Sequence, residues 1–140
     1  MSSTTIPTTP TKAKILLTGL NVQADIPDYF RTLYGTPQEI KAKIDADTQR
    51  IREFGYDVTL YYMDDQNPLA GLDWLAAALR AESFKGIMVG SGLRLVPPQT
   101  ELFEKVVDVC RRESPGSIFM FNYGPGTNFE TLERNQERLG

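Results

Sequence analysis

The chain of 140 residues contains no histidine and only one cysteine, and both shortages exclude whole classes of chemistry. Without an imidazole there is no Ser–His–Asp triad, no histidine-ligated metal and no histidine acid–base catalysis. The single cysteine, Cys110, has no partner for an intramolecular disulfide. Because an unpaired thiol without an export signal is typical of a reducing compartment, we expect a cytoplasmic protein.

Long hydrophobic runs and a strong charge are also lacking. No segment approaches the ~18 consecutive apolar residues of a membrane span, so we expect no membrane partner. Fifteen Lys and Arg stand against eighteen Asp and Glu, a net charge of −3. A domain that coats nucleic acid is usually basic, and we therefore expect no nucleic-acid partner.

The composition is otherwise that of a folded domain, with 41% hydrophobic and 24% charged residues. Residues 1–12 differ from the rest, because they are mostly small and hydroxylated and are interrupted by Pro7 and Pro10. This pattern predicts a flexible tail, followed by a single domain over residues 13–140.

Short apolar segments alternate four times with segments in which apolar residues recur at helical spacing. The predicted strands are residues 14–18, 57–63, 86–90 and 117–121. Such an alternation is built from βαβ units with right-handed crossovers. We therefore predict an α/β fold, a three-layer αβα sandwich around a four-stranded parallel sheet of flavodoxin-like order 2-1-3-4.

Several local signals predict where helices begin and end. Thr36 and Glu39 form a capping box around Pro37, and Gly55 is placed to end the helix that follows. Thr127 with Glu130 has the spacing of a second capping box. The segment 19–36 has no such signal, and we expect a long loop whose aromatic side chains either cover a ligand or pack onto the sheet.

Ligands of such sheets bind beyond the carboxyl ends of the strands, where the strand order reverses, here between the first and third strands. The third strand is followed by Gly90-Ser91-Gly92-Leu93-Arg94. The glycines allow backbone N–H groups to approach a ligand, and the guanidinium of Arg94 suits a carboxylate or phosphate. The loop is therefore a candidate anion site. The alternative is a tight turn whose arginine pairs with a neighbouring acid.

The exits of the other strands contribute further candidates. Asn122 and Tyr123 follow the fourth strand and can hydrogen-bond or stack on a ligand, although the glycines and proline after them also fit a purely geometric turn. The predicted ligand-binding set is Gly19, Asn21, Gly90, Ser91, Gly92, Arg94, Asn122 and Tyr123.

Familiar cofactor motifs are missing. No G-x-G-x-x-G follows the first strand, no Walker A motif occurs, and Gly90-Ser91 stands where a receiver domain carries its phosphorylated acid. Asp64 and Asp65 after the second strand could hold Mg²⁺, but a solvated pair capping the next helix is the stronger interpretation. We predict no metal site, and the sequence identifies no cofactor.

Four stretches carry a resemblance to a known group of proteins: ILLTGL from Ile15, DADTQRIREFGYDV from Asp45, GIMVGSGLRLVPPQTELFEKVVDVC from Gly86, and FNYGPGT from Phe121. In these stretches the chain resembles a small family of single-domain, flavodoxin-like proteins of bacteria and fungi with a strand–GxGxR–helix motif. The resemblance implies the same fold and directs attention to Gly90, Gly92, Arg94 and Asn122. It implies no reaction.

Three functions remain open from the sequence. The first is a domain that binds an anionic or nucleotide-like small molecule at the carboxyl edge of the sheet. The second is a histidine-independent enzyme, an isomerase, a lyase or an N-glycoside-cleaving enzyme, with Asp25, Asp64 or Asp65 as acid or base and Arg94 stabilising negative charge. The third is an interaction protein that forms oligomers and has no ligand.

Overall fold

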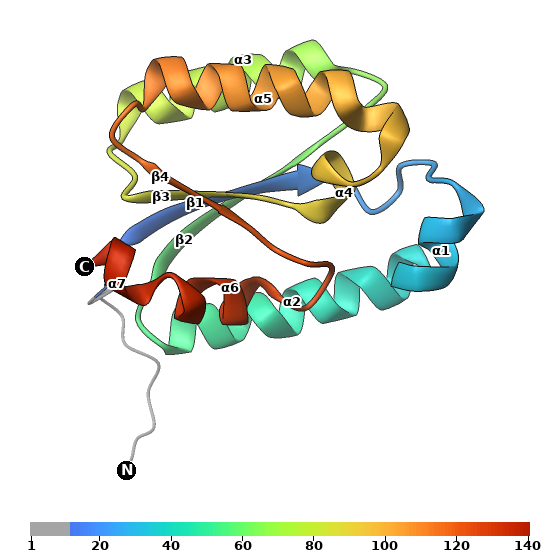
Figure 1. Ribbon diagram of the computed structural model, residues 1–140, viewed down its shortest axis with the longest axis horizontal. Coiled ribbons are helices and arrows are strands. Elements are labelled where there is room, and N and C mark those ends of the chain that lie inside the picture. Colours follow the sequence, from blue (N-terminus) through green and yellow to red (C-terminus); the bar gives the residue numbers. More distant parts are fainter. Residues whose placement is uncertain (1–11) are drawn as a thin grey trace.

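A computed structural model describes residues 12–140, so the predicted tail lies outside the described residues except for Lys12. Its centre is a parallel sheet of four strands (Figure 1): β1 (Lys14–Leu20), β2 (Asp57–Met63), β3 (Gly86–Val89) and β4 (Ile118–Phe121). The strand order is β2-β1-β3-β4, and all neighbours are parallel. The predicted α/β class and strand order are confirmed.

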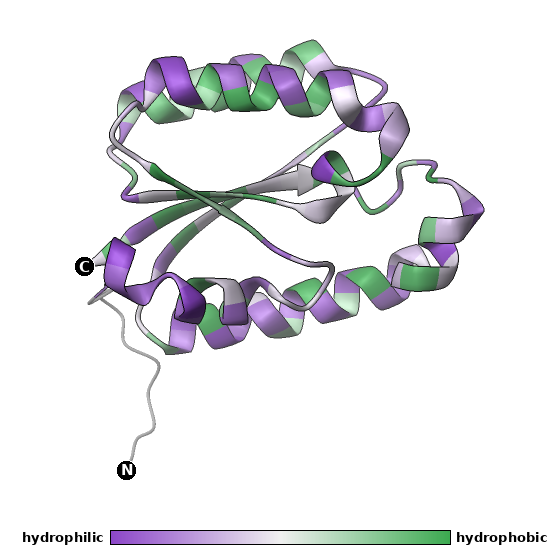
Figure 2. Cartoon of the chain, in the orientation of Figure 1, coloured by the Kyte–Doolittle hydropathy of each residue, from purple (hydrophilic) through white to green (hydrophobic). Residues whose placement is uncertain are grey.

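Helices cover both faces of the sheet, which makes three layers (Figure 1). One face is covered by α3 (Pro68–Ala81) and α5 (Thr100–Glu113), and the other by α2 (Pro37–Glu53), α6 (Asn128–Arg134) and α7 (Gln136–Leu139). Figure 2 shows the apolar stripes of α3 and α5 turned toward the sheet. This pattern is what amphipathic helices on a buried sheet require.

Two cores result, one on each face of the sheet. Leu16 of β1 packs with Leu75 of α3 and Val106 of α5, whereas its neighbour Leu17 packs with Ile51 of α2. Alternate residues of a strand point to opposite faces, so a continuous apolar strand supplies both cores. Cys110 is fully buried in the core beneath α5, in the apolar stripe that the sequence indicated.

The first set of helix signals is confirmed. Thr36 accepts a hydrogen bond from the Glu39 N–H at 3.1 Å, and Glu39 Oε1 accepts one from the Thr36 N–H at 2.9 Å. Gly55, with φ of 98°, follows the end of α2 in a conformation that favours glycine.

The second predicted capping box is wrong. Thr127 Oγ1 accepts hydrogen bonds from the N–H groups of Tyr123 and Gly124 and donates to the Gly124 carbonyl, so it closes the preceding turn. The N–H groups at the start of α6 are bound instead by Asp47, a distant residue of α2. A sequence motif cannot reveal a cap that another element supplies.

The predicted long loop 19–36 also needs correction, because it contains the helix α1 (Asp28–Tyr34). No side chain of the described residues caps this short helix, which explains why no signal for it is found in the sequence. The third-strand exit likewise forms a short helix, α4 (Ser91–Arg94), followed by a 3₁₀ turn over Pro97–Gln99. Over residues 12–140, no helix has the length and apolarity needed to cross a membrane.

Candidate functional site

A cavity of about 70 Å³ lies at the carboxyl edge of the sheet, where β1 and β3 end and the strand order reverses. In Figure 1 this is the edge at which β1 points toward α1 and α4. The walls are formed by the last residues of the strands, by the loops that follow them, and by α1 and α2. The lining residues are Leu17, Gly19, Leu20, Asn21, Val22, Ala24, Ile26, Tyr34, Ile40, Ile44, Tyr62, Gly90, Ser91, Gly92, Val96, Asn122, Pro125 and Asn128.

Most of the residues singled out from the sequence meet at this cavity. Its lining includes Gly19, Asn21, Gly90, Ser91, Gly92 and Asn122. The glycines allow the strand ends to approach closely, since a Cβ on Gly90 would lie 3.3 Å from the Cα of Gly19. The strand exits therefore converge as a parallel sheet predicts, while ligand contact by these residues stays a prediction.

Arg94 and Tyr123 do not line the cavity. The Arg94 guanidinium donates from Nη2 to the Asn122 carbonyl at 2.7 Å, and its Cζ lies 5.5 Å from the centroid of the Phe121 ring. Tyr123 is 65% exposed, and the Arg134 guanidinium lies over its ring. Arg94 therefore joins the exit of β3 to that of β4, a contact that neither interpretation of the loop had predicted.

Asn122 organises the cavity from a buried position. Its Oδ1 accepts a hydrogen bond from the Ser91 N–H at 2.7 Å, and its Nδ2 donates to Asn128 Oδ1 at 2.7 Å. The Asn128 N–H in turn donates to Asp47 Oδ2 at 2.5 Å. This chain of hydrogen bonds fixes the exits of β3 and β4 against α2, so Asn122 has a structural role beside any contact with a ligand.

Asp47 is a buried carboxylate that sequence reasoning missed. Its two oxygens accept hydrogen bonds from the N–H groups of Asn128 and Phe129, at the start of α6. Burial raises the pKa of Asp47, and these two hydrogen bonds offset part of the rise. Asp47, a residue of α2, thus caps the helix α6 and helps to hold the residues around the cavity in place.

Two tyrosines of the lining, Tyr34 and Tyr62, were also missed as site residues. The hydroxyl oxygen of each is buried and has no hydrogen-bond partner among the described residues. Buried polar groups are nearly always paired, because an unpaired one costs free energy. These two hydroxyls are therefore the unusual chemical feature of the cavity.

Glycines make room for both tyrosine rings. A Cβ on Gly19 would lie 3.4 Å from ring carbons of Tyr62, its register partner on β2, and a Cβ on Gly124 would lie 3.3 Å from Cε1 of Tyr34. Burial raises the pKa of Tyr62 to about 12, with a contribution from the negative charges of Asp45 and Asp47. The Tyr62 hydroxyl therefore stays protonated at neutral pH and can donate a hydrogen bond.

The signal that could have identified Tyr62 is a tyrosine that pairs with a glycine of the neighbouring strand near the carboxyl ends of both strands. The register that pairs Tyr62 with Gly19 became known only with the sheet. For Tyr34, the sequence predicted that aromatic side chains of the loop either cover a ligand or pack onto the sheet and assigned Phe30 to packing, but a predicted loop gave no means of choosing between Tyr29 and Tyr34. Once α1 is known, Tyr34 is the buried one, whereas Tyr29 is 70% exposed.

The carboxylates considered for acid–base catalysis lie outside the lining. Neither Asp25, Asp64 nor Asp65 lines the cavity. Asp64 accepts a hydrogen bond from the Gln66 N–H at 2.9 Å, and Asp65 accepts one from Gln99 Nε2 at 3.4 Å. Within residues 12–140 there is no group of three or more acidic or cysteine side chains placed to hold a metal ion.

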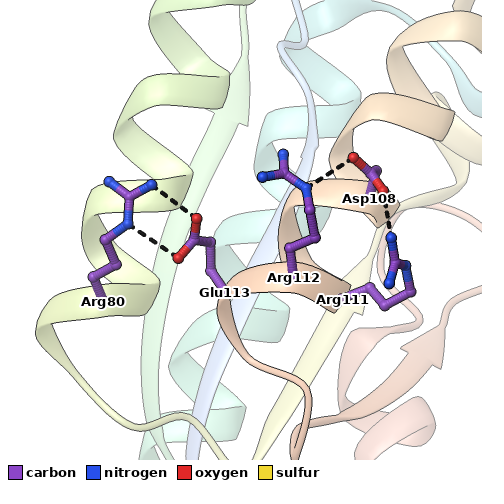
Figure 3. Close-up of polar contacts among 5 residues, drawn as sticks. All are labelled: Arg80, Asp108, Arg111, Arg112 and Glu113. Atoms are coloured by element: carbon purple, nitrogen blue, oxygen red, sulfur yellow. Dashed lines mark hydrogen bonds and ion pairs between the residues drawn. The ribbon is translucent and has the colours of Figure 1, made fainter.

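A wider groove, between the outer surfaces of α3 and α5, is a weaker candidate. Its volume is about 480 Å³, but it is shallow, and four of its seven charged side chains are already paired. Arg80 donates to both carboxylate oxygens of Glu113, and Asp108 accepts from Arg111 and Arg112 (Figure 3). Exposed ion pairs of this kind are typical of a solvated helix surface.

Comparison with models of known protein families gives no match, and comparison with curated protein sequences gives none either. The fold and the site therefore define the class: a three-layer, flavodoxin-like α/β domain with a small cavity at the topological switch point of its sheet. The function has to be argued from that cavity, because fold alone implies none.

Proposed function

We propose that the protein binds a small molecule in the cavity at the carboxyl edge of the sheet. One observation carries the proposal: the lining contains two tyrosines whose buried hydroxyls have no partner among residues 12–140. Because the two oxygens are almost inaccessible, a bound molecule that accepts hydrogen bonds would supply the missing partners once the tyrosine side chains shift toward it. The position agrees with the general rule that open parallel sheets bind ligands where their strand order reverses.

The cavity volume limits how much of a ligand is enclosed. A cavity of ~150 Å³ holds the six heavy atoms of a benzene molecule, so one of about 70 Å³ holds about three heavy atoms. The cavity therefore encloses one end group of a ligand, and the remainder would extend through the mouth. It supports a small or narrow molecule better than the enclosed nucleotide that the sequence had suggested.

A thermal-shift screen with two matched variants tests this function. The compounds are nucleotides, sugar phosphates, flavins, carboxylic acids, and neutral amides and ketones. Ile44→Trp places a large ring in the cavity wall, whereas Ala42→Trp adds the same ring at an exposed position of α2. We expect a hit that raises the Tm of the wild type and of Ala42→Trp but not that of Ile44→Trp. A hit that stabilises all three equally would place binding elsewhere and refute the proposal.

Self-association through the same edge is the second candidate function, and a specific observation favours it. Of the exposed large apolar side chains, five lie in the segments that follow the carboxyl ends of the strands: Tyr29 and Leu33 in α1, Leu69 in the first turn of α3, and Leu95 and Tyr123 in loops. Apolar side chains gathered at one edge can form an interface. Light scattering tests this candidate, since a monomer at 100 μM, roughly the concentration at which weak association becomes visible, would exclude a stable homo-oligomer.

A further inference from the structure

In the part of the chain that the structure describes, no charged side chain lines the cavity. Its walls are mainly apolar, with Val22, Ile40 and Ile44 among them. A charged group loses its hydration when it enters such a site, and only an opposite charge or several hydrogen bonds can compensate for that loss. An uncharged ligand avoids this cost.

The charged side chains nearest to the cavity do not line it, and the Nε of one of them, Arg94, is buried without a partner among the described residues. Arg94, the cation that the sequence had assigned to this loop, is bound to the Asn122 carbonyl. Lys43 packs its stem beside Gly126 and does not line the cavity. On the side of α2, the negative charges of Asp45 and Asp47 are near enough to act on the Tyr62 hydroxyl. An anion bound next to Tyr62 would therefore lie near these negative charges, and no cation in the lining would offset them.

A cation is no better served by the cavity. No carboxylate lines it, and both oxygens of Asp47 are already engaged by the N–H groups of Asn128 and Phe129. An ammonium group would also compete for the hydroxyl oxygens while leaving the hydroxyl protons without an acceptor. The group that the site lacks is thus an uncharged hydrogen-bond acceptor.

We propose that the ligand is an uncharged molecule whose carbonyl group, in a small amide, ketone or aldehyde, enters the cavity and accepts hydrogen bonds from Tyr34 and Tyr62. This inference rests on the proposed binding function and names the chemical class that the site selects. A carbonyl oxygen has two lone pairs and no proton, and it therefore matches hydroxyl donors. A carbonyl carbon, its oxygen and one substituent atom are three heavy atoms, which suits the volume of about 70 Å³.

A set of three compounds of nearly equal size isolates the effect of charge: butyramide, butyrate and butylammonium. Their dissociation constants can be measured by NMR titration of the ¹⁵N-labelled full chain at pH 7. Tyr34→Phe and Tyr62→Phe each remove one hydroxyl and keep the ring. Tyr123→Phe is the matched control, because Tyr123 lies outside the lining.

We expect butyramide to bind at least tenfold more tightly than butyrate or butylammonium. Each of Tyr34→Phe and Tyr62→Phe should weaken butyramide binding by roughly two- to tenfold, the range for one hydrogen bond, and Tyr123→Phe should leave it unchanged. Tighter binding of butyrate or butylammonium would overturn the proposed class and leave the binding function standing.

Absence of binding by all three compounds would also overturn the class. A hit among the other compounds of the thermal-shift screen, blocked by Ile44→Trp, would then still support the binding function. A butyramide affinity that is unaffected by both cavity tyrosine variants would refute the role given to the two hydroxyls.

Discussion

Tyr62 combines an apolar environment with a polar group that the folded chain does not satisfy. Its ring packs against Gly19, which makes it part of the frame, while its hydroxyl is buried without a partner. A phenylalanine would fill the same space without burying a polar group. The hydroxyl therefore lowers the stability of the ligand-free protein, and binding an acceptor would reverse this loss.

Tyr62→Phe should raise the free energy of unfolding at pH 7 by about 1 kcal/mol, because it removes a buried donor without a partner. Urea denaturation of the two proteins measures this difference. A loss of stability of similar size would show that the hydroxyl has a partner in the folded protein, such as an ordered water, and would weaken the argument for a ligand.

The pH dependence of stability gives a second test of Tyr62. Its pKa is about 12 in the folded protein and near 10.0 in the unfolded chain, so above pH 10 the unfolded chain releases a proton that the folded protein retains. Unfolding is therefore favoured as the pH rises, by about 2 kcal/mol at pH 12. Urea denaturation at pH 8 and pH 11 should show a smaller loss for Tyr62→Phe. Burial raises the pKa of Cys110 to about 12 as well, but its effect is present in both proteins and cancels.

Arg94→Ala separates the two interpretations of the third-strand exit. Since Nη2 of Arg94 donates to the Asn122 carbonyl, we expect the substitution to lower the free energy of unfolding by about 1 to 2 kcal/mol. Arg134→Ala, which removes a more exposed arginine from the Phe121 carbonyl, is the control and should have a smaller effect. Unchanged stability of Arg94→Ala together with lost binding of carboxylates or phosphates would instead support the predicted anion site.

At the scale of elements, α6 depends on a carboxylate from another helix. Asp47→Ala leaves the N–H groups of Asn128 and Phe129 without their acceptor in a buried position, and we expect a loss of about 2 to 3 kcal/mol. Thermal or urea denaturation measures it. Asp45→Ala, two residues earlier on the same helix, removes only a surface pair with Lys41 and should change stability little. Equal effects of the two substitutions would contradict the capping role of Asp47.

Elements were predictable where their signals are local. The start of α2 was predicted because Thr36, Pro37 and Glu39 are close together in the sequence and act on one another. The cap of α6 was not predictable, since Asp47 and Asn128 meet only after the chain has folded. The same limit applies to the cavity: the glycines of its rim were visible in the sequence, whereas the pairing of Tyr62 with Gly19 depends on strand register.

The whole molecule should unfold in one transition, because the two cores share a single sheet. Ile51 belongs to the core under α2, and Leu75 to the core under α3. Both are fully buried, so Ile51→Ala and Leu75→Ala should each lower the free energy of unfolding by about 2 to 5 kcal/mol. Urea denaturation followed by both circular dichroism and tryptophan fluorescence should give one coincident transition for each variant. A separate transition of either layer would contradict this expectation.

The overall architecture was predictable because four apolar strands alternating with helices allow few right-handed arrangements. The chemical character of the site was not predictable from the sequence, because it depends on where long side chains point. Arg94 turns to Asn122 and leaves the cavity without charge, and this single contact changes the expected ligand from an anion to a neutral carbonyl compound.

The location of binding is the central claim, and amide chemical-shift mapping with butyramide tests it most directly. We expect the largest ¹H–¹⁵N shifts at Gly19, Gly90 and Gly92, around the cavity, and none at Lys85 or Gly116, at the opposite edge of the sheet. Shifts confined to the groove between α3 and α5, or no shifts at saturating butyramide, would contradict the account of the cavity as a site for a small carbonyl compound.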